Sequence, residues 1–470
     1  MIICLSVYFG QKLEHSGSPS AFDYEALYRK SVTFISITTI NFYICNLYDF
    51  SSFKRKRELL ARIIPCFIVI SFIVVAINFI FPYMNLSRIS YIVTLSLLIP
   101  SIIFHRFIYH FMINMNKFKE KIIVIGTRDI AKRLLFTLKN YNNTEYEILG
   151  FVAEDAKYFH EDEECCPVIG TIKDLKAITK TSRPDVVVVA LSEMRGAFPS
   201  NEILNCKLQG IRVEDWPTFY EKLTGKIVIQ NLRPSWIIFA DGFTRNNLTG
   251  TVKRLIDVLL SVLGLCFSFP LMIIIGIMIK IDSPGPIFFR QERVGENGKI
   301  FTLIKFRTMV ADAEKNTGPV WSQSSDPRVT KLGKLFRRTG MDEIPQLFNV
   351  LQGDMSFVGP RPERPHFVAE LQEKIPYYSQ RLAVRPGVTG WAQVRYGYGA
   401  TVIDAIEKLE YDLYYIKNMS IFLDFLIILS TIHKVVFAKV SVQTETEGNT
   451  WLSYSQQETN TRNLASIEKE

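Results

Sequence analysis

The chain has 470 residues, enough for two or three domains that each bury a core. Apolar residues make up 48% of it and the mean hydropathy is +0.13, so we expect a membrane protein rather than a soluble one. The net charge of +9 suits nucleic acid, anionic lipid headgroups or a phosphorylated substrate. Nucleic acid is the weakest of these partners, because no pattern of a nucleic-acid-binding module is present.

The seven cysteines argue against a disulfide framework and a zinc site, since their number is odd and no pair has CxxC spacing. The six histidines are equally scattered along the chain. Any metal is therefore expected to be a hard ion held by carboxylate and phosphate oxygens.

The first 115 residues are predicted to form a membrane domain. Three nearly charge-free runs, residues 31–48, 63–82 and 89–113, are each about as long as a helix that crosses a bilayer. The loop between the first two, SSFKRKRELLAR, is strongly basic, which places it on the cytoplasmic side.

The same topology places residues 11–30 outside, so one more crossing is needed before them. The opening residues, MIICLSVYFG, are apolar but only about half as long as a span. We therefore expect that the first transmembrane helix lacks its start, or that the assigned start codon lies too late. A signal peptide fits less well, because neither a basic region nor a small-residue cleavage site is evident.

Residues 119–230 are predicted to form a soluble α/β domain. KIIVIG, YEILGFVAE and PDVVVVAL each have the pattern of a strand, and TRDIAKRLLFTLKN has that of a helix. Strands that alternate with helices indicate a doubly wound, Rossmann-like parallel sheet.

The nucleotide-binding fingerprint of such a sheet is incomplete here. Only Gly126 is present, followed by Thr127, Arg128 and Asp129 where small residues would let the backbone approach a pyrophosphate. A structural or regulatory module is the better interpretation, and nucleotide binding stays open as the alternative. This domain is also a candidate for contacts in a homodimer.

Residues 255–279 form a fourth apolar run. Basic residues flank it on both sides, so both flanks favour the cytoplasm. Pro270, near its middle, removes a helical hydrogen bond and biases Phe269 away from the α region. We therefore expect a kinked re-entrant helix that enters one leaflet and returns, with a simple transmembrane helix as the alternative.

A β-hairpin is predicted next, because Asn297-Gly298 lies between flanks of alternating apolar residues. Its second strand carries Lys305 and Arg307. The following run, DPRVTKLGKLFRRTG, supplies further cations that include Arg337. Such a run is usually a solvated face, and beside a membrane it could equally bind lipid phosphates.

The adjacent acids Asp342 and Glu343 lie close to a predicted helix start. Pro345 suits only the first turn of a helix, and a helix start presents free N–H groups to anions. Asp342 could simply cap this helix. Capping would account for one acid, but not for the second acid and the arginines around the pair.

Phosphoryl transfer accounts for the whole set. A carboxylate can attack phosphorus, cations then neutralise the charge, and a divalent ion bridges phosphate oxygens. Asp342 would be the nucleophile and Glu343 a Mg²⁺ ligand. The cations expected to contact phosphate are Lys305, Arg307, Arg337 and Arg361, the last on a backbone stiffened by two prolines. From the residues alone, an acid–base hydrolase remains equally open.

Three motifs, KFRTM, RRTGMDEIPQLFNVLQGDMSFVGPRPE and RPGVTGWAQV, resemble the bacterial sugar transferases, which are monotopic polyprenyl-phosphate hexose-1-phosphate transferases. The resemblance covers residues 250–440, and the overall layout resembles the long form found in exopolysaccharide assembly. It implies transfer of sugar 1-phosphate from a UDP-sugar to undecaprenyl phosphate, with release of UMP. It also implies a nucleophile and a magnesium ligand at Asp342 and Glu343, and phosphate contacts at Lys305, Arg337 and Arg361.

The family's re-entrant helix implies a break here at Ser268 and Pro270, although Phe269 separates the two residues that usually adjoin. The RPGVTGWAQV stretch is expected to line the nucleotide pocket, with a stacking face on the tryptophan. Its members are Arg385, Pro386, Gly387 and Trp391. A packed turn with a core tryptophan is an equally good interpretation.

Residues 421–438 are predicted to form an amphipathic helix at the membrane interface, and the tail 441–470 to be disordered. The expected location is the bacterial inner membrane, multi-pass, with the catalytic domain on the cytoplasmic face. The alternative function is a non-catalytic membrane scaffold that senses a nucleotide. Neither the sugar nor the oligomeric state follows from the sequence.

Overall fold

The computed structural model describes most of the chain from residue 119 to residue 437 and one helix before it. The described ranges are 24–44, 119–126, 129–140, 146–154, 168–191, 198–229, 234–243, 247–310, 326–397, 399 and 401–437, with single positions at 66, 70, 96, 100 and 104. The chain divides into two compact units. The first contains residues 1–122, 142–149 and 183–185, and the second contains the remainder.

In the first unit, helix α2 spans Tyr24–Ile44 and overlaps the predicted span 31–48, although it begins earlier. The predicted spans 63–82 and 89–113, like the opening ten residues, lie outside the described residues apart from single helical positions. Within the described part of the chain, one helix is long and apolar enough to cross a membrane, Leu248–Asp282. Multi-pass insertion therefore stays a prediction.

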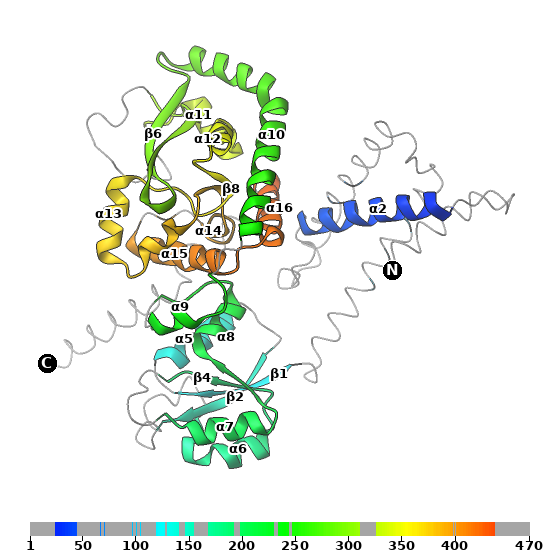
Figure 1. The fold of residues 1–470 in the computed structure, drawn as a ribbon, viewed down its shortest axis with the longest axis vertical. Helices are drawn as coiled ribbons and strands as arrows, with labels where there is room; N and C mark the ends of the chain where they lie inside the picture. The colour runs from blue at the N-terminus through cyan, green and yellow to red at the C-terminus, as the bar shows by residue number, and fades with distance from the viewer. Residues whose placement is uncertain are drawn as a thin grey trace. The chain divides into compact units, whose positions relative to one another are not determined.

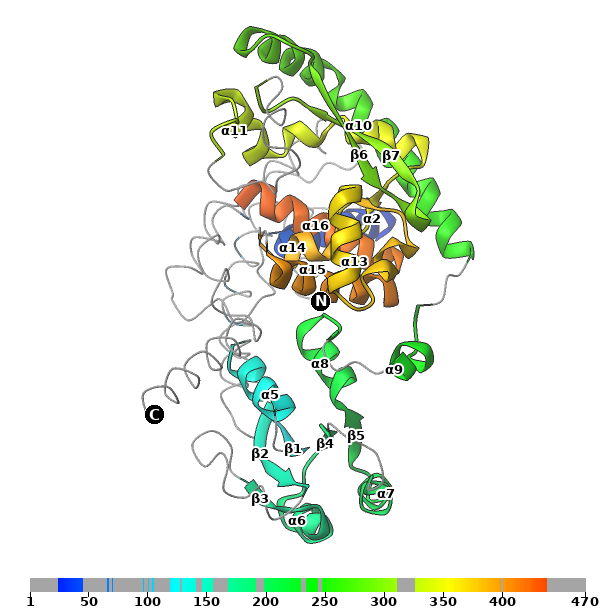
Figure 2. The same cartoon turned by 90° about the vertical axis from the view of Figure 1, so that its left-hand side faces the viewer.

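The α/β domain contains a five-stranded sheet in the order β3-β2-β1-β4-β5, with α5 and α8 on one side and α6 and α7 on the other (Figures 1 and 2). Its elements are β1 Glu120–Ile125, α5 Asp129–Asn140, β2 Tyr146–Ala153, β3 Val168–Thr171, η6 Ile172–Asp174, α6 Leu175–Ser182, β4 Val186–Val189, α7 Ser200–Leu208, β5 Arg212–Asp215 and α8 Trp216–Thr224. The predicted strands and helix are confirmed, and β2–β3 and β4–β5 are parallel. The short strands β3 and β5 were not predicted, because their four residues are mostly only half-buried and show no strong apolar run.

Gly126 has a packing reason to be glycine. Its φ is +122°, and an added Cβ would lie 2.6 Å from the carbonyl oxygen of Ala190, just after β4. The backbones of Gly126 and Val152 are also hydrogen-bonded. The ends of two strands approach closely here, and this contact is sufficient to require a glycine at position 126. The presence of Gly126 is therefore no evidence that the domain binds a nucleotide.

The rest of the second unit forms an α+β domain in which short strands are surrounded by helices (Figure 1). Its elements are α9 Pro234–Phe239, α10 Asn247–Asp282, β6 Phe288–Val294, η7 Glu296–Gly298, β7 Ile300–Phe306, α11 Lys331–Thr339, η8 Met341–Glu343, α12 Gln346–Gln352, β8 Ser356–Val358, α13 Pro365–Lys374, η9 Tyr378–Ala383, β9 Gly387–Thr389, α14 Trp391–Arg395, α15 Val402–Lys417 and α16 Ile421–Phe437. The predicted hairpin is confirmed: β6 and β7 are antiparallel, and Asn297 and Gly298 both have positive φ. The predicted helix at 421–438 is confirmed as α16, and the tail 441–470 lies outside the described residues.

Helix α10 contains 36 residues with Pro270 inside it. A straight helix of that length would measure about 54 Å, well beyond the roughly 30 Å of a bilayer core. Its ribbon bends in both views, and a proline is the usual cause of such a bend (Figures 1 and 2). Phe267 and Phe269 are 83% and 63% exposed, whereas Ile275 and Ile279 pack against Phe306. The helix therefore presents one apolar face outward and anchors the other in the domain.

Candidate functional site

A tight turn between α11 and α12 presents the two acids. Helix α11 ends at Gly340, which adopts φ +70°, and the 3₁₀ turn η8 then carries Asp342 and Glu343. Helix α12 begins at Gln346, and Pro345 is its N-cap residue. No side chain accepts a capping hydrogen bond from the first turn of this helix. The alternative in which Asp342 caps this helix is therefore wrong. The turn leaves both carboxylates available for other partners.

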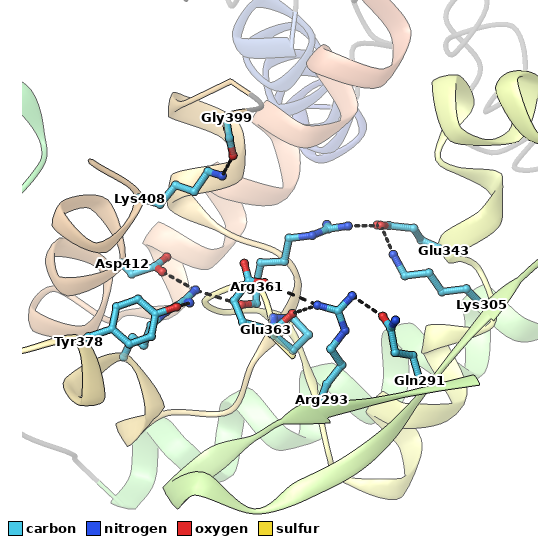
Figure 3. A network of polar contacts seen from close by, with 12 residues as sticks. Gln291, Arg293, Lys305, Glu343, Arg361, Glu363, Tyr378, Gly399, Lys408 and Asp412 are labelled. Carbon is cyan, nitrogen blue, oxygen red and sulfur yellow. Dashed lines mark hydrogen bonds and ion pairs between the residues drawn. The ribbon is translucent and has the colours of Figure 1, made fainter. Parts of the chain in front are cut away.

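Two cations converge on one oxygen of Glu343 (Figure 3). Lys305 Nζ lies 2.7 Å from Glu343 Oε1, and Arg361 Nη2 lies 2.8 Å from the same atom. Lys305 comes from β7 and Arg361 from the Pro-Arg-Pro loop after β8. Burial alone would raise the pKa of Glu343, but Arg361 and Lys305 outweigh it and lower that pKa to about 2. Glu343 is therefore anionic at any physiological pH.

Asp342 behaves in the opposite way. Its side chain is buried, and burial together with the negative charge of Glu343 raises its pKa although Lys305, Arg337 and Arg361 oppose the shift. The pKa of Lys305 is itself lowered by burial in spite of its acidic neighbours. Two adjacent carboxyl groups with pKa values driven apart are typical of a site that divides two chemical roles between them.

Arg337 belongs to the same neighbourhood. It lies in the last turn of α11, its Nε donates to Thr308 Oγ1 at 2.8 Å, and its side chain is exposed. An added Cβ on Gly333, one turn earlier, would overlap the carbonyl oxygen of Thr308. This glycine lets α11 lie directly against the residues that follow β7, which keeps Arg337 near the acids.

Arg307 binds backbone carbonyl groups in this structure, and its predicted phosphate contact stays a prediction. Its side chain is buried, with Nη1 2.7 Å from the Pro284 carbonyl oxygen and Nη2 2.6 Å from that of Ser283. A guanidinium that binds two carbonyl groups stabilises the turn between α10 and β6. Arg307 therefore serves this turn in the structure, and it follows Lys305 by two residues, just beyond the end of β7.

The loop that carries Arg361 depends on three glycines. Strands β8 and β9 pair in parallel and bring Gly359 against Gly387 and Gly390. A Cβ on any of the three would overlap backbone atoms of the facing segment. This contact joins the VGPRP and RPGVTG motifs, so the glycines of the second motif position the arginine of the first.

The predicted nucleotide-pocket residues occupy unlike environments. Arg385 is half-exposed and pairs with Glu296 at 3.3 Å, whereas Gly387 and Pro386 belong to the glycine contact and its edge. Trp391 is only 7% exposed: its ring stacks on Tyr414, and the guanidinium of Arg395 covers it at 4.4 Å. This position fits the packed-turn interpretation of Trp391, and a nucleotide contact remains a prediction for the whole stretch.

The helix break predicted at Ser268 and Pro270 does not interrupt α10, which continues through both positions. Ser268 is half-buried and its Oγ has no hydrogen-bond partner among the described residues, whereas Pro270 is exposed. The sequence did not single out a second group of polar residues behind Arg361 (Figure 3), namely Arg293, Arg381, Lys408 and Asp412, nor Asn349, which contacts β7. No local spacing marks them, because each acts through contacts with distant parts of the chain.

Two family models match this chain. One, described as bacterial sugar transferase, matches residues 248–438, and the other, described as a CoA-binding domain, matches residues 44–197. The first match contains the acids and all of the converging cations. The second covers most of the α/β domain and part of the predicted membrane domain.

Three curated relatives each match half of the chain or less. UDP-N-acetylgalactosamine-undecaprenyl-phosphate N-acetylgalactosaminephosphotransferase of Aeromonas hydrophila is 41% identical over 234 residues, 50% of this chain and 54% of that protein. UDP-glucose:undecaprenyl-phosphate glucose-1-phosphate transferase of Xanthomonas campestris pv. campestris is 39% identical over 219 residues, 46% of this chain and 44% of that protein. An exopolysaccharide production protein of Rhizobium leguminosarum bv. phaseoli is 41% identical over 186 residues, 38% of this chain and 93% of that protein. The chain thus spans about half the length of the first two relatives.

Proposed function

This chain belongs to the bacterial sugar transferase family, and from that premise we propose that it transfers sugar 1-phosphate from a UDP-sugar to undecaprenyl phosphate. UMP is the other product. The relatives named above as undecaprenyl-phosphate transferases support this reaction class, although they differ from one another in the sugar. The proposed role is the first step in assembling an exopolysaccharide repeat unit.

One observation carries the proposal: two cations hold Glu343 as an anion, while its neighbour Asp342 is buried and more basic than usual. A more basic carboxylate is a better nucleophile once it has lost its proton. Two acids in an acid–base hydrolase would flank a bond from opposite sides, whereas these are adjacent on one turn. The arrangement therefore favours phosphoryl transfer over hydrolysis.

The reaction is proposed in two displacements at the phosphorus that bears the sugar. A carboxylate oxygen of Asp342 first attacks this phosphorus, the bond to UMP breaks, and an aspartyl-phosphosugar forms. A phosphate oxygen of undecaprenyl phosphate then attacks the same phosphorus and releases the Asp342 carboxylate. Lys305, Arg337 and Arg361 are proposed to neutralise charge on the phosphate oxygens in both steps.

A Mg²⁺ ion fits this donor set. The described residues contain no cluster of three metal-ligating side chains, but Mg²⁺ is commonly held by one or two carboxylates together with substrate phosphates. Both described contacts of Glu343 fall on Oε1, which leaves Oε2 as the proposed ligand atom. The ion would supply charge neutralisation across the diphosphate of the substrate.

The membrane setting is proposed from α10 and α16. Their outward apolar side chains include Phe267 and Phe422, which are 83% and 70% exposed. We propose a re-entrant α10 and an interfacial α16, with the site on the cytoplasmic face of the bacterial inner membrane. Additional crossings are proposed for the first 115 residues.

The test is UMP release by membranes that contain the full chain, with undecaprenyl phosphate, Mg²⁺ and a panel of UDP-sugars. Asp342→Asn should abolish turnover and the covalent phosphosugar adduct seen by intact-protein mass spectrometry. Glu373→Gln, an exposed acid on α13, serves as the matched control and should keep both. Turnover by the Asp342→Asn variant would refute the nucleophile, and silence across the panel would favour a non-catalytic scaffold.

A further inference from the structure

The segment from Pro360 to Glu363, which carries Arg361, is held along its whole length. Each of its four carbonyl groups accepts a hydrogen bond, and the donors come from three other parts of the chain. The donors are Gly387 N–H to Pro360, Arg381 Nη2 to Arg361, Arg293 Nη1 to Pro362 and Val294 N–H to Glu363, at 2.9, 3.0, 2.9 and 2.9 Å. The two prolines also lock φ at their own positions. The segment is therefore restrained at every peptide.

The carbonyl of Arg361 itself is held by a buried ion pair. Arg381 is 8% exposed, and the Nη2 atom that donates to Arg361 also lies 2.9 Å from Asp412 Oδ2, on helix α15. Its Nη1 donates to Tyr378 Oη at 2.7 Å. Figure 3 shows Asp412 and Tyr378 on one side of Arg361, with Glu343 on the other. Among the described contacts, Arg381 reaches Glu343 only through Arg361.

A buried ion pair between an arginine and a single carboxylate is weak evidence for a gain in folding stability, because apolar residues of similar volume often stabilise the fold equally well. The guanidinium of Arg381 does more than neutralise Asp412. It also donates a charged hydrogen bond to the backbone carbonyl of Arg361, the residue whose side chain contacts Glu343 on the catalytic turn. Hydrogen bonds from an ionised donor are short, strong and directional. Because a peptide's orientation sets the direction of its Cα–Cβ bond, this bond controls where the Arg361 side chain points.

We propose that Arg381, oriented by Asp412 and Tyr378, is a positioning residue that fixes the backbone of Arg361 and so keeps its guanidinium on Glu343. The inference rests on the proposed function for its catalytic consequence. Its structural part does not, because the restraint on the segment can be measured without any substrate.

The structural part is tested by hydrogen exchange on the full chain in detergent micelles. Arg381→Met should raise exchange of the Val294 and Gly387 amides, which donate to this segment, by about tenfold or more, and leave residues 300–306 unchanged. Because Arg381→Met leaves Asp412 buried and unpaired, the double variant Arg381→Met/Asp412→Leu removes both charges. The double variant should recover stability but not the protection of the Val294 and Gly387 amides. Wild-type protection in either variant would overturn the proposal.

The catalytic part is tested by a double-mutant cycle with Arg361→Met. Arg381→Met should lower kcat/KM about tenfold to a hundredfold in the wild-type background, but less than about threefold when Arg361 is already Met. An equal loss in both backgrounds would mean that Arg381 acts only on general stability, and would overturn the proposal. Lys374→Met, which breaks an exposed ion pair on α13, should change neither readout. A wild-type chain that releases no UMP would refute the proposed function, while the exchange result would still decide the positioning role.

Discussion

Asn349 offers a direct test of how the strand that carries Lys305 is held. Its side chain is fully buried on α12, where Oδ1 accepts from the Ile304 N–H at 3.0 Å and Nδ2 donates to the Thr302 carbonyl at 2.8 Å. These two groups lie on the outer edge of β7, opposite β6. The amide of Asn349 therefore satisfies the edge of β7 in place of a neighbouring strand.

The change Asn349→Leu keeps the branching and the number of heavy atoms of the side chain and removes both hydrogen bonds. Each buried backbone group left without a partner costs about 1–3 kcal/mol, and the added apolar burial offsets about 1–2 kcal/mol. We expect the free energy of unfolding to fall by about 2–4 kcal/mol. The value of kcat/KM should also fall when corrected for the folded fraction, because Lys305 follows Ile304 by one residue.

The assay is denaturant unfolding of the purified full chain in detergent, followed by UMP release on the same preparation. Gln352→Leu, at the exposed end of the same helix, is the matched control and should stay within about 0.5 kcal/mol of wild type. A loss below about 0.5 kcal/mol for Asn349→Leu would refute the reasoning, since it would mean that water or a rearranged strand satisfies both groups.

Three further predictions concern charge and packing. Lys305→Met removes the positive charge that most lowers the pKa of Asp342, so the acid limb of the pH profile of kcat/KM should move to higher pH; an unmoved limb would contradict the coupling. Gly333→Ala would force a Cβ into backbone atoms, so the denaturant midpoint should report a loss of about 1–3 kcal/mol, and a wild-type midpoint would argue against the close contact. Burial raises the pKa of Asp412 to about 6 against the pull of a nearby guanidinium, so the folded state binds this proton more tightly than the unfolded state. The free energy of unfolding should fall by about 3 kcal/mol as the pH rises from about 4 to about 6, and Asp412→Asn should lack this fall. If wild type and Asp412→Asn showed the same dependence of this free energy on pH, the raised pKa of Asp412 would be excluded as its cause.

Local patterns in the sequence were sufficient for several elements. The apolar strand of residues 121–126, the run of four valines in β4 and the Asn297-Gly298 turn all appear where predicted, because periodicity and turn chemistry act over a few residues. The strands β3 and β5 were missed because their sheet partners, more than their own residues, make them strands.

The candidate site shows the same division. Lys305 and Arg361 were predicted from the sequence, and the structure places both on Glu343. Arg307 carries the same charge two residues from Lys305, yet it binds carbonyl groups of the turn after α10. Sequence cannot separate these two cations, because the difference lies in which distant segment each side chain meets.

The amino-acid sequence by itself determined the family, the paired acids and the cations available to them, since these depend on residue identity and spacing within short motifs. Tertiary structure alone decided which cations share an oxygen of Glu343, and why Gly359 and Gly387 must be glycines. It also revealed that Arg381 and Asp412 lie behind Arg361. Arg381 contacts Arg361 across 20 residues of sequence and Asp412 across 31 residues. Electrostatic and steric forces depend on distance in space, and only the folded chain sets those distances.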